Sequence, residues 1–140
     1  MLERIRDKLP EGETVDFKTL AKSKLFTARR QGNEVMFTIK GKKDEPTIVI
    51  IDFAEFQDVL CLLSQKTDGV KFGNIQEFRI GDDQCALNSI EGHIAHYFYG
   101  KPIGGTHTRR ATYIAPVLNE AGLIKFVTNP IEISLIQEVN

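Results

Sequence analysis

The residues best suited to bind a ligand in this 140-residue chain stand between positions 104 and 113. Two glycines are followed there by Thr106, His107, Thr108, Arg109, Arg110, Thr112 and Tyr113. A guanidinium group can place two parallel N–H groups on a phosphate or on the edge of a guanine, and threonine hydroxyls also bind phosphates. The segment therefore predicts a surface that contacts phosphates and base edges.

An amphipathic helix is expected to carry these side chains. Thr106 is suited to cap its first turn, and Gly122 can take the left-handed conformation that ends a helix. Apolar residues recur between them at helical spacing, at Ala111, Ile114, Leu118 and Ala121. Pro116 lies inside this helix and lacks the amide that would bond to Thr112, so we expect it to bend or split the helix.

Further elements are predicted on both sides of this helix. A shorter helix over residues 89–99, with Asn88 and Glu91 at capping-box spacing, precedes it. Two strands over residues 123–128 and 131–136 follow it and turn at Asn129-Pro130. Over residues 84–137, the order helix, turn, helix, hairpin resembles the winged helix-turn-helix superfamily.

The resemblance implies how the chain would bind nucleic acid. In that superfamily the second helix lies in the major groove and the hairpin contacts the backbone. Carried over, either arginine could contact guanine, while the helix N-terminus and the threonines would hold a phosphate. The residues that this resemblance assigns to nucleic-acid binding are Lys101, Thr106, His107, Thr108, Arg109, Arg110, Thr112, Tyr113 and Lys125.

The first half of the chain predicts a meander and a covering helix. A short helix is expected over residues 2–9, and residues 14–24 fit either a helix capped by Asp16 or a strand. Strands are expected over residues 25–30, 34–40 and 47–51, with turns at 31–33 and 42–45. The last strand is apolar and β-branched, as is typical of a buried central strand.

A helix over residues 53–66, with Asp52 and Glu55 at capping-box spacing, follows these strands. Its broad apolar face must be covered, either by the meander or by a second copy of the chain. Another strand is expected within residues 71–81. The predicted fold class is α+β: a three-stranded antiparallel meander with a covering helix over residues 1–81, and a winged-helix-like module over residues 82–140.

Composition limits the function classes. The net charge of −1 argues against a protein that coats nucleic acid through bulk positive charge, although a local basic surface remains compatible with it. We expect no membrane partner, because no apolar run reaches membrane-spanning length. The N-terminus has no apolar segment of a signal peptide, so we expect a cytoplasmic protein whose Cys61 and Cys85 are free thiols.

We predict neither a catalytic residue nor a metal or cofactor. His93 and His96 are three positions apart on a helix, but no cysteine pair or carboxylate stands at ligand spacing beside them. The acidic residues Asp52, Asp82 and Asp83 fit a helix cap and a turn better than a magnesium site. Potential nucleophiles have no evident base partner.

The preferred function is therefore non-enzymatic nucleic-acid binding, with duplex DNA as the expected partner and a regulatory role. A homodimer formed through the helix over residues 53–66 would present two recognition helices. Two alternatives stay open. One is a protein-interaction or scaffold module that uses the same fold, and the other is a subunit or fragment of a nucleic-acid-processing enzyme.

Overall fold

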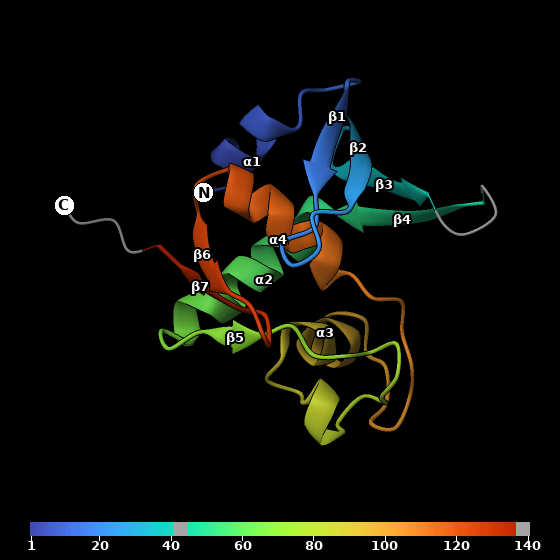
Figure 1. Cartoon of the computed structure of the whole chain (residues 1–140), viewed down its shortest axis with the longest axis vertical. Coiled ribbons are helices and arrows are strands. Elements are labelled where there is room, and N and C mark those ends of the chain that lie inside the picture. Colours follow the sequence, from blue (N-terminus) through green and yellow to red (C-terminus); the bar gives the residue numbers. More distant parts are fainter. Residues whose placement is uncertain (41–44, 137–140) are drawn as a thin grey trace.

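A computed structural model describes residues 1–40 and 45–136 of the chain, and its fold is α+β (Figure 1). The N-terminal part is a four-stranded antiparallel sheet in the order β1-β2-β3-β4. Its strands are β1 (Thr14–Lys18), β2 (Leu25–Gln31), β3 (Glu34–Lys40) and β4 (Pro46–Asp52). Apart from Glu45, the turn that we expected at residues 42–45 lies outside the described residues.

The sheet contains one strand more than the three-stranded meander predicted. Residues 14–18, which fitted either a helix or a strand, form β1 and pair antiparallel with β2. Phe17 is buried and stacks on Phe26 of β2, with ring centroids 5.8 Å apart. Burial of this aromatic pair favours the extended conformation over the helix that Asp16 could have capped.

The prediction that residues 47–51 form a buried central strand is wrong. They belong to β4, which is an edge strand of the sheet. Val49 and Ile51 are buried, whereas Ile48 and Ile50 are 54% and 53% exposed. A continuous apolar run suggested cover on both faces, but the described part of the chain covers only one face of this sheet.

Helix α2 (Phe53–Gln65) follows β4 and packs on the inner face of the sheet. The Asp52 carboxylate accepts a hydrogen bond from the Ala54 amide at 2.8 Å, so the predicted cap is confirmed. Phe56, Leu60 and Leu63 are at most 3% exposed, as expected. The chain's own elements bury this apolar stripe, so α2 does not need a second copy of the chain to cover it.

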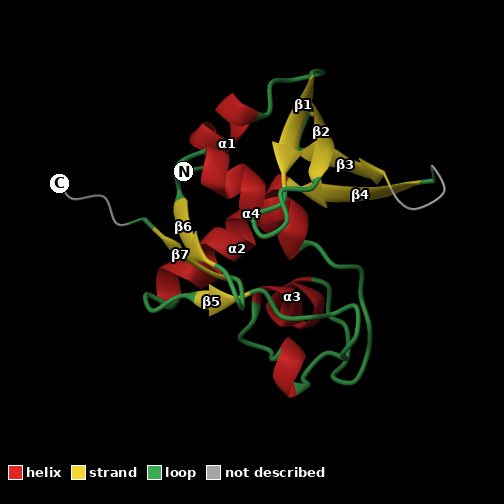
Figure 2. Cartoon of the chain, in the orientation of Figure 1, coloured by secondary structure: helices red, strands yellow, loops and turns green. Residues whose placement is uncertain are grey.

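The C-terminal part contains short helices and a small three-stranded antiparallel sheet (Figure 2). The sheet has the order β5-β7-β6, formed by β5 (Val70–Lys71), β7 (Glu132–Leu135) and β6 (Ile124–Val127). The helical segments before α4 are η2 (Asp83–Cys85), α3 (Ile90–His93) and η3 (Ile94–Phe98), which continues α3 as a π-helix. The expected order of helix, connection, helix and hairpin is thus present.

The strand that we expected within residues 71–81 is almost absent, because β5 ends at Lys71. Gly73 has a φ of +80°, and a Cβ placed there would lie 2.4 Å from the Ser89 hydroxyl oxygen. Such a backbone conformation interrupts a strand and lets the following loop pack closely against the start of α3.

Helix α4 (Ala111–Glu120) lies in the middle of the molecule (Figure 1). It begins four residues later than predicted and continues through Pro116 to Glu120, so the expected split at Pro116 does not occur. Residues 113–118 of this helix are all buried. A helix enclosed in this way cannot lie in the major groove of a duplex while the fold remains intact.

A single main core connects the two predicted subdomains. It contains Phe37 and Ile51 from the large sheet, Leu118 from α4 and Ile133 from β7. Within residues 1–40 and 45–136, no helix combines the length and the apolar character needed to cross a membrane.

Candidate functional site

Two neighbouring arginines before α4 have opposite environments. Arg110 is 7% exposed, whereas the side chain of Arg109 reaches the surface and donates to Gln76 Oε1 at 3.3 Å. We expected both side chains to point outward, and for Arg110 this is wrong. The prediction failed because it did not anticipate a buried carboxylate from α2 that pairs with this arginine.

Arg110 is the centre of a buried polar network. Its Nε donates to Glu55 Oε2 at 2.5 Å, and its Nη2 donates to the Ile50 carbonyl of β4, also at 2.5 Å. Tyr99 donates its hydroxyl to the other oxygen of Glu55, and its ring lies 5.0 Å from the Arg110 guanidinium carbon. The network joins α2, β4, the end of η3 and the start of α4, so its charges connect four elements inside the fold.

The same network changes the role that we predicted for Glu55. Glu55 was expected to complete the capping box of α2, but it is 0% exposed and its carboxylate binds Arg110 and Tyr99. Burial raises the pKa of Glu55, and the hydrogen bonds from Arg110 and Tyr99 oppose that rise. Burial, followed by the contact with Glu55, raises the pKa of Tyr99 to about 12.

A second buried carboxylate, Glu91 of α3, occupies the N-terminus of α4. Both of its oxygens lie 2.9 Å from the Arg110 amide nitrogen, and Oε1 also accepts from the Ala111 amide at 3.2 Å. Burial raises the pKa of Glu91 to about 7, although these backbone hydrogen bonds oppose the rise. Glu91 therefore takes the place at the helix N-terminus that we assigned to a phosphate.

The rest of the predicted recognition helix does not form one exposed face. Tyr113 is 2% exposed, and its ring centroid lies 5.5 Å from that of Phe26 and 5.6 Å from that of Phe37. The expected surface position of Tyr113 is wrong, because the aromatic ring completes the core beneath the large sheet. Thr106 is not the N-cap of α4, since Arg110 holds that position.

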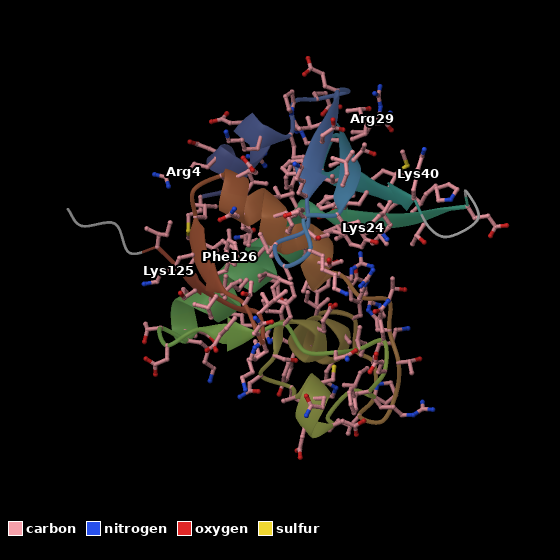
Figure 3. The ribbon with its side chains drawn as sticks, in the orientation of Figure 1. Arg4, Lys24, Arg29, Lys40, Lys125 and Phe126 are labelled. Atoms are coloured by element: carbon pink, nitrogen blue, oxygen red, sulfur yellow. The ribbon has the colours of Figure 1, made fainter. Side chains whose placement is uncertain are left out.

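The remaining predicted residues lie on the surface, but at separate places. Thr106 and Thr108 are exposed in the segment before α4, where the His107 ring lies 4.6 Å from the Tyr99 ring. Burial and the nearby Arg110 and Lys101 charges lower the pKa of His107. Lys101 and Lys125 are also exposed, and Figure 3 shows Lys125 at the left edge of the molecule, apart from Lys24 near the centre of the view.

Arg109 and Thr112 line a hollow of about 370 Å³, which we call the basic hollow. Its wall combines the β1–β2 connection, the loop after β5 and the first turn of α4. The residues that line it are Thr19, Leu20, Ala21, Lys22, Lys24, Ile39, Phe72, Gly73, Asn74, Ile75, Gln76, Glu77, Glu91, Arg109, Thr112 and Ile131. The structure thus brings two of the predicted residues to one concave surface.

The basic hollow combines positive charge with apolar and amide groups. Lys22, Lys24 and Arg109 supply three cations, against the carboxyl groups of Glu77 and Glu91. The carboxylate of Glu91 already accepts hydrogen bonds from the two backbone amides described above. Phe72 contributes an apolar wall, and Asn74 and Gln76 contribute amide groups. These groups can bind a ligand that carries a phosphate and a flat ring.

The sequence interpretation missed Lys22 and Lys24 as candidate site residues. They lie in the segment whose conformation was ambiguous, and only the pairing of β1 with β2 places their connection beside α4. The positively charged turn and the arginine far along the chain are each visible in the sequence. Their proximity depends on long-range packing that no local pattern records.

The two spaced histidines have separate local partners. His93 Nε2 lies 3.0 Å from Asp58 Oδ2 of α2, so these two side chains contact each other as a histidine–carboxylate pair. His96 Nδ1 lies 2.8 Å from the Lys101 carbonyl oxygen. The described residues contain no group of three or more His, Cys, Asp or Glu side chains placed to hold a metal ion.

Comparisons with known proteins do not assign this chain to a group. Neither the family models, nor the curated proteins, nor the solved structures include one that matches it.

Proposed function

We propose that this chain is a non-enzymatic nucleic-acid-binding protein that holds a nucleotide unit in the basic hollow. The observation that carries the proposal is the position of Lys22, Lys24 and Arg109 around one hollow of about 370 Å³. Hollows of this size are typical of sites for small molecules and cofactors. The three cations come from two segments of the chain and converge on the same space.

The chemistry of the lining fits the parts of a nucleotide. Lysine and arginine bind phosphate, and arginine can do so with two N–H groups at once. The ring of Phe72 offers a surface for stacking, which every base can use. The side-chain oxygens of Asn74 and Gln76 accept hydrogen bonds from the Glu77 amide and from Arg109, and their NH2 groups can donate to the polar edge of a base.

The proposed partner belongs to the class expected from the sequence, but it is bound in a different way. Duplex recognition by α4 in the major groove is not proposed, because α4 is enclosed by the rest of the fold. An unpaired strand, whose bases can leave the stack and enter a hollow, fits this site better than an intact duplex. A free nucleotide has the same chemistry, and the experiment separates the two.

The test measures fluorescence anisotropy of labelled single-stranded and duplex oligonucleotides at several salt concentrations. We expect the wild type to bind the single strand more tightly than the duplex. Lys24→Ala and Arg109→Ala should each weaken binding and reduce the salt slope by about 0.7 for each phosphate of the single strand that the variant no longer neutralises. Competition by an unlabelled mononucleotide distinguishes a site for free nucleotides from one that needs a strand.

Lys125→Ala is the matched control. It removes the same charge as Lys24→Ala from an exposed lysine that does not line the basic hollow and lies apart from Lys24 (Figure 3). We expect its affinity and salt slope to equal those of the wild type. The proposal is wrong if the wild type binds neither the strands nor the mononucleotide at low salt, or if Lys24→Ala and Arg109→Ala bind as it does.

A further inference from the structure

The outer face of the large sheet exposes a group of large apolar side chains. Leu25, Met36, Ile48 and Ile50 are 55%, 39%, 54% and 53% exposed, respectively. Met36 of β3 stands directly opposite Ile50 of β4 in the sheet register. Ile48, on the same face, is the next outward residue along β4, so the apolar side chains of the two strands adjoin. Adjoining exposed apolar residues of this kind mark interaction surfaces.

The charges that β3 and β4 carry on this face are separated along the strand direction. Glu34 and Asp52 are register partners at one end of the β3–β4 pair. Lys40 lies at the other end of β3, and Lys18 pairs with Leu25 at that same end of the sheet. Figure 3 shows Lys40 toward the far end of β3. On this face the β3–β4 pair thus has an acidic end, an apolar middle and a basic end, and the exposed Arg29 of β2 stands opposite Met36, beside the apolar middle.

We propose that this outer sheet face binds a second copy of the chain, face to face. The two-fold axis lies between the two sheets, parallel to their planes and perpendicular to the strands. Rotation about this axis places the second copy's strands over the same strands of the first copy, in the opposite direction. That operation places the acidic end of one copy over the basic end of the other, with Glu34 over Lys40 in both directions. It also places Ile48 of each copy over Ile50 of its partner.

The arrangement satisfies the requirements of a symmetric dimer. An isologous interface uses the same surface on both subunits and must therefore be self-complementary. The separated charges of β3 and β4 are self-complementary, because the acidic end of each copy lies over the basic end of the other. The apolar middle is self-complementary because the same apolar side chains of both copies are buried against each other. Two sheets can pack in this way through their side chains, about 10 Å apart. Such a dimer forms whether or not the basic hollow binds nucleic acid.

The experiment is a charge exchange followed by sedimentation velocity across the micromolar concentration range. We expect the wild type to dimerise. Glu34→Lys or Lys40→Glu alone places like charges against each other and should raise the dimer dissociation constant about tenfold, the factor that corresponds to 1.4 kcal/mol. The double variant exchanges the two ends and should restore the wild-type constant. Glu120→Lys, at the end of α4, is the matched control and should leave dimerisation unchanged.

A second variant tests the apolar middle without charge changes. Ile48→Thr with Ile50→Thr keeps the β-branched shape that favours strands but reduces the apolar surface. It should weaken the dimer while thermal melting followed by circular dichroism stays cooperative. A wild type that remains monomeric throughout the concentration range overturns the proposal. A dimer that none of these variants weakens also overturns it, because that dimer uses another surface.

Discussion

Arg110 and Arg109 are adjacent in the chain, but they belong to two regions with opposite uses of charge. Around Arg110, each buried charge has partners inside the fold: Glu55 pairs with the guanidinium, and Glu91 accepts from backbone amides. Around Arg109, three cationic residues line a hollow that the chain leaves open. Charges enclosed with their partners stabilise a fold, whereas charges that converge on an open surface are available to a ligand. The difference separates structural from candidate binding residues where the sequence shows only a row of polar side chains.

The largest expected effect is the loss of stability on removal of Arg110. Arg110→Met leaves the Glu55 carboxylate buried without its cation, and we expect the free energy of unfolding to fall by about 3–5 kcal/mol. Urea unfolding followed by circular dichroism measures this change. Adding Glu55→Gln removes the unpaired charge and should recover part of the loss. Equal stability of Arg110→Met and the wild type would show that the buried network does not hold the fold together.

A smaller effect is expected from titration of Glu91. Its pKa in the folded chain is about 7, above the ordinary value of 4.5, so the unfolded chain releases this proton at lower pH than the folded chain does. The stabilising contribution is complete below pH 4.5 and is lost as the pH rises to about 7. Glu91→Gln cannot titrate. The wild type should therefore lose about 1–3 kcal/mol relative to this variant across that range, in urea unfolding at successive pH values.

The variant keeps Glu55, whose pKa is also raised, so it should retain part of the wild-type slope. Parallel pH profiles for the two proteins would contradict the assignment of this titration to Glu91.

The smallest effect on stability is expected at Arg109. Arg109→Ala removes a partly exposed side chain whose hydrogen bond to Gln76 is a surface contact, and the free energy of unfolding should change by no more than about 0.5 kcal/mol. Thermal melting of this variant beside Arg110→Met gives the direct comparison of the two arginines. A large loss of stability would mean that Arg109 is structural, and a binding defect in this variant would then have another explanation.

Local patterns predicted much of the fold. The hairpin of β2 and β3, helix α2 with its Asp52 cap, and the C-terminal hairpin all follow from turn residues and apolar periodicity. The exposure of β4 and the late start of α4 did not follow from them. An apolar run shows that a strand can be buried but does not show how many faces are covered. The start of α4 is set by Glu91, a residue from a different helix, which the sequence around Thr106 does not reveal.

The candidate site was harder to predict than the fold. Arg109 and Thr112, which the sequence suggested as binding residues, do line a concave surface, but Lys22 and Lys24 beside them were not predicted. Arg110 and Tyr113 have the same polar character in the sequence as residues of a binding surface. Their burial depends on Glu55, Phe26 and Phe37, which lie far away along the chain. Side-chain type alone therefore does not distinguish a ligand contact from an internal one.

The hydrogen bond between Arg110 and the Ile50 carbonyl also bears on resistance to aggregation. An edge strand such as β4 presents free backbone groups on which a strand from another chain can add. One of these carbonyls already has a partner that comes from the chain's own interior. An incoming strand that pairs there must displace Arg110, which would weaken its hold on Glu55. Addition of a strand at this position is thereby coupled to disruption of the buried network.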